Sequence, residues 1–106
     1  MIFSRARRLR IFVYHQAIDM RCGYERLLHF VREEMKHDVL DGHMFLFLGR
    51  NRKRAKVLLF DKTGLLLISK KLLGGHIMAV EDLSSVNEIK IDDLEMILSG
   101  AHIYFS

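Results

Sequence analysis

The chain has 106 residues, which fits one domain, and we expect residues 1–106 to form a single domain. Half of the residues are hydrophobic, and the single cysteine, Cys22, excludes an intramolecular disulfide and fits a reducing cytoplasm. The net charge of +4 is unevenly distributed: residues 1–71 hold 16 Lys/Arg against 7 Asp/Glu, and residues 72–106 hold 1 lysine against 6 acidic residues. This split favours an anionic partner on one side and a cationic or protein partner on the other, with ordinary surface charge mixing as the alternative.

The first residues predict neither export nor membrane insertion. Arg5, Arg7, Arg8 and Arg10 precede a short apolar run, Ile11–Tyr14, which is too short for a signal-peptide core or a bilayer span. We therefore expect a soluble, cytoplasmic protein that has no membrane partner. The four arginines are also typical of a basic arm.

The first half of the chain predicts a strand followed by a long helix. Leu9–His15 has strand character, and Asp19 is a good helix N-cap because its carboxylate can accept free amide protons. Apolar residues after Asp19 recur at helical spacing and predict a helix of about four turns. They are Met20, Tyr24, Leu27, Leu28, Val31 and Met35.

Strand signals dominate the second half. The apolar runs are His43–Leu48, Ala55–Phe60 and Leu65–Ser69, and weaker strand signals lie at His76–Val80, Glu88–Ile91 and Ala101–Phe105. Residues 61–64 have the composition of a four-residue hairpin connection. Asp92 and Glu95 form a variant capping box that opens a short helix, which Gly100 closes.

This order predicts an α+β fold: an antiparallel meander sheet with one long N-terminal helix and one short C-terminal helix. The central strands are continuous apolar runs, so both faces of the sheet need cover. The second layer comes either from another subunit or partner, which leaves a homo-oligomer open, or from the tail and the loop in the eighties.

Catalytic and metal chemistry lack a supporting pattern. The six histidines form no i, i+4 pair on a helix and no Cys-x-x-Cys accompanies them, so we expect no metal site. Cys22 has no positioned base, and Asp19, Asp61 and Asp92 each have a structural role as cap or turn former. Gly74-Gly75 lacks the continuation of a phosphate-binding loop. We expect no enzyme activity and no cofactor.

Basic residues concentrate between two predicted strands. Five cations occur within seven residues, and we expect them to project into solvent, where guanidinium groups suit phosphate oxygens. They are Arg50, Arg52, Lys53, Arg54 and Lys56, and Lys70 and Lys71 extend the patch. Arg21 opposes the dipole of the predicted helix, so it needs either a carboxylate such as Asp61 or a bound phosphate. A solvated loop is the alternative interpretation of the basic run.

Several short segments occur in an order that resembles a known family. They are Asp19-Met20-Arg21, Gly23-Tyr24, Gly42-His43-Met44-Phe45-Leu46-Phe47, Arg52-Lys53-Arg54, Lys56-Val57-Leu58, Asp61, Gly64 and Lys70-Lys71-Leu72. Over residues 11–76 the chain resembles the TnpB-type accessory protein, the second open reading frame, of the insertion-sequence-sixty-six family of transposable elements. The chain departs from the family at residues 77–80, where an aromatic residue and a proline are usual, and at Phe60, where tryptophan or tyrosine is common. These differences weaken a base-stacking mechanism.

The resemblance implies an accessory role in transposition, beside a DDE-type transposase and a companion accessory protein, and it supplies no catalytic residues. Our hypothesis is a non-catalytic accessory protein that binds DNA backbone at the element ends through the basic loop and assists the transposase. The set of candidate DNA-binding residues is Arg21, Arg50, Arg52, Lys53, Arg54, Lys56, Lys70 and Lys71. The alternative is a protein-interaction subunit of the transposase complex without direct DNA contact.

Overall fold

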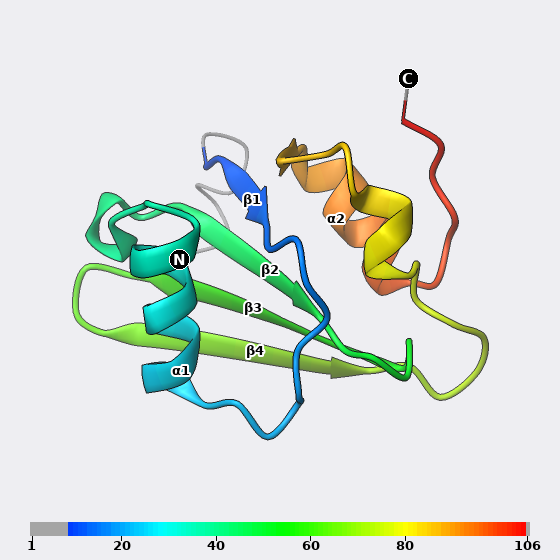
Figure 1. Ribbon diagram of the computed structural model, residues 1–106, viewed down its shortest axis with the longest axis horizontal. Helices are drawn as coiled ribbons and strands as arrows, with labels where there is room; N and C mark the ends of the chain where they lie inside the picture. Colours follow the sequence, from blue (N-terminus) through cyan, green and yellow to red (C-terminus); the bar gives the residue numbers. More distant parts are fainter. Residues whose placement is uncertain (1–8, 106) are drawn as a thin grey trace.

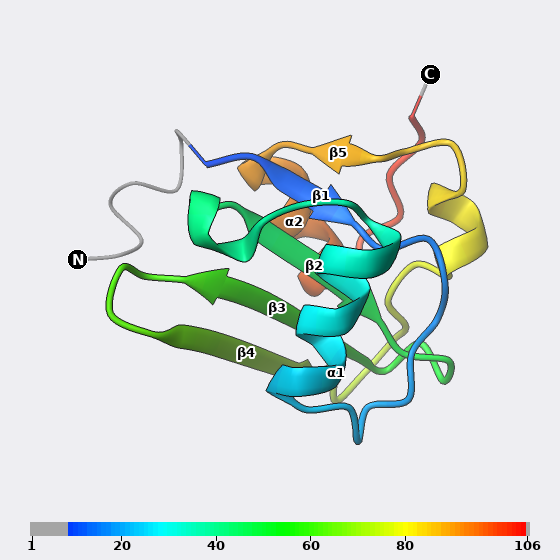
Figure 2. The same cartoon turned by 60° about the vertical axis from the view of Figure 1, so that its left-hand side comes forward.

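The computed structural model describes residues 9–105, which fold around a five-stranded mixed sheet (Figures 1 and 2). The strand order across the sheet is β4-β3-β2-β1-β5. The strands are β1 (Ile11–Val13), β2 (Met44–Leu48), β3 (Arg54–Phe60), β4 (Leu65–Lys71) and β5 (Glu88–Ile89). The helices are α1 (Tyr24–His29), which continues as a π-helical turn (Phe30–Glu34), and α2 (Ile91–Leu98), with short 3-10 turns at Val39–Asp41 and Val80–Leu83.

The predicted antiparallel meander is wrong because β1 runs parallel to β2. Ile11 lies opposite Met44 and Val13 opposite Leu46, and the 30 residues between the two strands carry α1 across one face of the sheet. A crossover through a helix is the usual way to join neighbouring parallel strands. The other pairings, β1–β5, β2–β3 and β3–β4, are antiparallel, so the sheet is mixed.

The predicted long helix is also wrong at its start. Residues 19–22 form a turn, in which the Cys22 amide donates to the Asp19 carbonyl at 3.0 Å, and helical hydrogen bonding begins when Leu27 donates to Gly23. Asp19 is therefore not the cap of α1, and its carboxylate accepts the Arg21 amide instead at 2.8 Å. Only α1 and its π-helical turn remain of the four turns that the apolar stripe predicted.

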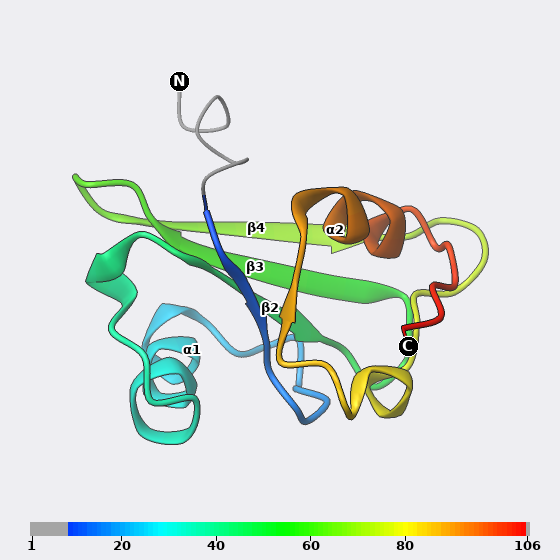
Figure 3. The same cartoon turned by 90° about the horizontal axis from the view of Figure 1, so that it is seen from above.

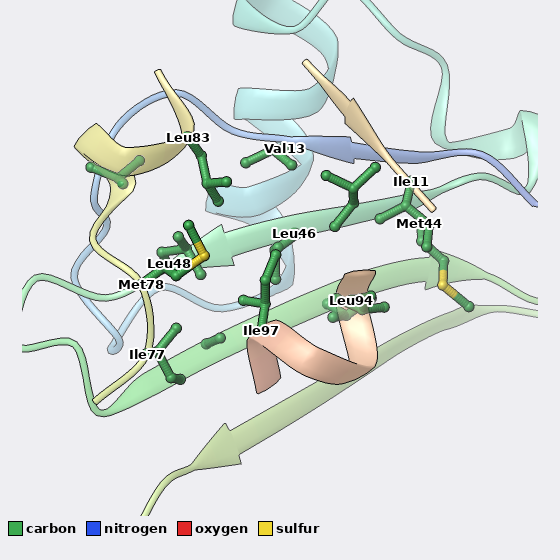
Figure 4. Close-up of a cluster of buried hydrophobic side chains, with 14 of the residues drawn as sticks. Ile11, Val13, Met44, Leu46, Leu48, Ile77, Met78, Leu83, Leu94 and Ile97 are labelled. Carbon is green, nitrogen blue, oxygen red and sulfur yellow. The ribbon is translucent and has the colours of Figure 1, made fainter. Parts of the chain in front are cut away.

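Each face of the sheet has its own hydrophobic layer, and both layers come from this chain (Figure 3). On one face, Leu27 and Val31 of the helical segment pack onto Phe45, Phe47 and Leu58. The other face is covered by α2 and residues 77–83 (Figure 4). Ile103 and Phe105 of the tail, which are partly buried, pack against the same layer. Of the two predicted sources for the second layer, the tail and the eighties loop are confirmed.

Several local predictions can be compared directly with the structure. The β3–β4 hairpin is confirmed, and the Asp61 carboxylate accepts the amides of Thr63 and Gly64 in its turn. The strands predicted at residues 76–80 and 101–105 are wrong, because neither segment pairs with the sheet. The cap of α2 is also different from the predicted one. The N-cap is Lys90, two residues before Asp92, and the Asp93 carboxylate, not that of Glu95, accepts the amide of the N-cap residue at 3.0 Å.

Candidate nucleic-acid interface

The turn between β2 and β3 lies against the segment before α1 at one end of the sheet. Ile18 bridges to Gly49 in parallel, and its amide donates to the Leu48 carbonyl at 2.9 Å. A Cβ atom on Gly49 would lie 3.1 Å from the Arg54 carbonyl oxygen and 3.2 Å from Met20 Cγ. Glycine at position 49 therefore permits the close approach that brings the basic loop beside residues 19–22.

Three of the five loop cations bind backbone carbonyl groups, so the expectation that all five project freely into solvent is wrong. Lys56 is half-buried, and its Nζ donates to the carbonyls of Met20 and Cys22, each at 2.7 Å. Arg52 Nε donates to the Ile77 carbonyl at 2.9 Å, and Lys53 Nζ donates to the Gly75 carbonyl. These side chains hold the loop to the segments before α1 and after β4.

The backbone of Arg52 adopts a conformation that is uncommon for a residue other than glycine. Its φ is +60°, in the left-handed region that non-glycine residues seldom occupy. Its amide bonds to Gly49, and its carbonyl accepts the Ile77 amide at 2.7 Å. The backbone carbonyl and the side chain of Arg52 therefore both bind Ile77 and hold the segment after β4 in place.

The other candidate cations of this region are exposed. Arg50 lies in the turn, Arg54 begins β3, and Lys70 and Lys71 end β4. Arg54 lies directly opposite Lys71, whereas Lys70 pairs with Ala55. Because side chains alternate along a strand, Arg54 and Lys71 share the α1 face with Lys56, and Lys70 lies on the opposite face.

Arg21 has a local carboxylate partner that differs from the predicted Asp61. Its Nη2 lies 2.7 Å from Asp19 Oδ2, and its side chain is 91% exposed. The hydrogen bonds from Arg21 hold the pKa of Asp19 well below its ordinary value, and the charge of Arg50 adds to the effect. Arg21 and its partner Asp19 thus belong to the turn that Lys56 holds against β3.

The result is a cluster of four exposed cations, which we call the basic end. It consists of Arg21, Arg50, Arg54 and Lys71. Within residues 9–105, the ion pairs are Arg10–Glu88, Arg21–Asp19 and Arg32–Glu33, so only Arg21 of the basic end has a carboxylate partner there. The separation of Lys70 from Lys71 could have been predicted from the two-residue alternation of β4. The carbonyl contacts of Lys56 could not, because they join residues 34 and 36 positions apart.

The remaining sequence predictions concern the N-terminal arginines, metal binding and membrane insertion. Arg5, Arg7 and Arg8 of the predicted basic arm lie outside the described residues, and Arg10 pairs with Glu88 at 2.7 Å. Residues 9–105 contain no group of three metal-ligating side chains, and no helix among them is long and apolar enough to cross a bilayer.

A surface hollow lies away from the basic end. Its volume is about 480 Å³, and it is formed by the end of the α1 segment and the residues that follow, with no cysteine or serine among its lining. The lining residues are Leu28, Val31, Arg32, Lys36, His37, Asp38 and Val39. The hollow contains none of the cations that the sequence predicted as a binding site.

Comparison with known proteins identifies the family. The profile of the family described as "IS66 Orf2 like protein" matches residues 9–104. The chain belongs to this family. It is also 33% identical over 92 residues to an uncharacterized protein, y4hO, of Sinorhizobium fredii, an alignment that covers 87% of this chain and 80% of that protein. No solved structure matches the chain significantly. The resemblance found in the sequence is thereby confirmed, and the match extends through α2 into the tail.

Proposed function

We propose that this protein is a non-catalytic accessory factor of insertion-sequence transposition that binds DNA backbone through the basic end. Membership of the IS66 Orf2 like family supports the accessory role. The observation that carries the DNA contact is the pairing of Arg54 with Lys71 across β3 and β4, with no carboxylate partner for either within residues 9–105.

Electrostatics explains why this pairing favours an anionic ligand. Like charges directly opposite each other on a sheet destabilise it, and a phosphate group between them replaces repulsion with attraction. Arginine suits this role because its guanidinium can donate two parallel hydrogen bonds to one phosphate, and both Arg54 and Arg50 are exposed. Phosphate contacts position a protein on DNA without reading sequence, which fits a chain that lacks tryptophan.

The remaining loop cations act by shaping the site. Lys56 holds the 19–22 turn, which contains Arg21, against β3, the strand that begins with Arg54. Arg52 and Lys53 fix the segment that follows β4, the strand that ends at Lys71. We therefore propose direct DNA contact for the basic end and a positioning role for these three residues.

The partners that we propose are DNA at the element ends, the transposase and the companion accessory protein. Residues 72–106 hold 6 acidic residues against 1 lysine, and α2 carries three of the carboxylates on the face of the sheet away from α1. This distribution supports a division of surfaces in which the α1 face meets DNA and the α2 face meets protein.

The experiment is a fluorescence-anisotropy titration of the protein against duplex DNA over a range of salt concentrations. One duplex carries an element end and the other has the same composition in scrambled order. Four phosphate contacts predict a slope of log K against log salt of about −3.6 for both duplexes. Absence of DNA binding, together with binding to the purified transposase, would contradict the proposal and favour a protein-interaction subunit.

A further inference from the structure

We infer that β4 pairs in antiparallel fashion with β4 of a second copy of this chain, so that two sheets join into one. In the described part of the chain, β4 is the outermost strand and no other strand pairs with its outer edge (Figure 2). An exposed strand edge is a template for pairing with another chain. The inference rests on β4 itself and does not depend on DNA binding.

The hydrogen bonds of the hairpin show which groups of β4 face outward. The Leu72 amide donates to the Lys53 carbonyl at 2.7 Å, and the Gly64 carbonyl accepts the Asp61 amide at 3.0 Å. Because inward and outward groups alternate in an antiparallel strand, the even-numbered residues of β4 bond to β3. The N–H and C=O groups of the odd-numbered residues, Leu65, Leu67, Ser69 and Lys71, therefore point away from the sheet.

β4 lacks most of the features that usually protect an edge strand. Natural edges are short, bulged, charged or interrupted by proline. β4 has seven residues in unbroken register with β3, and the chain contains no proline. Lysines occupy only its last two positions, and residues 65–68, which are all leucine or isoleucine, are half-buried rather than covered. This apolar half of the edge is open to a partner strand.

A second copy fits this edge because β4 is complementary to itself in one register. Pairing centred on Ile68 places Leu65 opposite Lys71 of the second copy and Leu67 opposite its Ser69. All outward N–H and C=O groups of the strand then find partners. The lysines of the two copies lie at opposite ends of the joined strands, so like charges stay apart. Two-fold symmetry of this kind is the commonest arrangement among homo-oligomers.

The same register makes a geometric prediction for engineered cysteines. Ile68 would face Ile68 of the second copy in a non-hydrogen-bonded pair, where Cα atoms are about 4.5 Å apart, within disulfide range. The two copies of Leu66 would be four residues apart along the strands, about 13 Å, which is too far. Leu66 is half-buried and lies on the same face as Ile68, so it provides the matched control.

The experiment combines sedimentation equilibrium of the full chain with cross-linking in a Cys22→Ser background. We expect a dimer, rapid oxidation of Ile68→Cys to a covalent dimer, and at least tenfold less cross-linking of Leu66→Cys. Ser69→Pro removes an outward N–H and leaves every β3–β4 bond intact, so it should weaken the dimer about tenfold or more.

Three results would overturn the inference. The first is a parent chain that is monomeric at concentrations of about 0.1 mM, where a standard interface would be populated. The second is a dimer that survives Ser69→Pro and does not cross-link through Ile68→Cys, because it would use another surface. The third is cross-linking of Leu66→Cys that equals or exceeds that of Ile68→Cys, which would contradict the register.

Discussion

Replacement of Lys56 by methionine tests whether this lysine holds the fold together or meets DNA. The substitution keeps the length and apolar stem of the side chain and removes the ammonium group. That group donates to the carbonyls of Met20 and Cys22 at 2.7 Å each. Both carbonyls would lose their donor in a half-buried site, and the 19–22 turn would lose its link to β3.

The size of the effect follows from the two contacts. A hydrogen bond that involves a charged group contributes about 1.5–3 kcal/mol when it is well buried. Here one ammonium serves both carbonyls and remains partly solvated, so we expect a total loss of about 2 kcal/mol. For a domain of this length, the urea midpoint should fall by about 1 M and the melting temperature by about 10 °C.

Urea unfolding followed by circular dichroism measures this loss. Arg54→Met is the control because Arg54 is exposed on the same strand and face, and its replacement should change the free energy of unfolding by less than about 0.5 kcal/mol. A parent-like midpoint for Lys56→Met, with a flatter salt dependence of DNA binding, would refute the reasoning and place Lys56 among the DNA contacts.

Two further predictions concern the core and the pH dependence of stability. Leu27→Ala should lower the free energy of unfolding by about 2–5 kcal/mol because Leu27 is fully buried. Leu28→Ala should lower it clearly less because Leu28 is half-buried. Equal melting temperatures of the two variants would contradict this packing. Arg10 lowers the pKa of Glu88, so the folded state gains stability above the ordinary glutamate pKa of 4.5 and loses it as the pH falls through the lowered value. As the pH is lowered, the free energy of unfolding of Glu88→Gln should therefore fall less steeply than that of the parent. Equal pH dependence of the two proteins would contradict a stabilising Arg10–Glu88 ion pair.

The sequence pattern predicted some elements and not their arrangement. The apolar runs and the Asp61–Gly64 turn located β2, β3 and β4 because strand character and turn chemistry are local properties. The parallel pairing of β1 with β2 was missed, although a helix between two strands separated by about thirty residues is typical of a crossover unit. The start of α1 was missed because a distant side chain, Lys56, holds residues 20–22 out of the helix.

The candidate site was predicted as a run of basic residues, and in the structure three of them, Arg52, Lys53 and Lys56, contact backbone carbonyls. Composition cannot distinguish Arg52 and Lys53, whose side chains donate to the carbonyls of Ile77 and Gly75, from Arg50 and Arg54, for which the described residues show no such contact. That distinction depends on contacts between segments about 25 residues apart, and such contacts leave no periodic signal in the sequence.

The most direct test of the proposed DNA interface compares Lys71→Gln with Lys70→Gln. The two lysines are adjacent and exposed, and both substitutions lower the net charge equally, but the side chains lie on opposite faces of the sheet. The measurement is the slope of log K against log salt for a short duplex. We expect Lys71→Gln to flatten the slope by about 0.9 and Lys70→Gln to leave it unchanged. Equal slopes for the two variants would contradict a DNA interface on the α1 face.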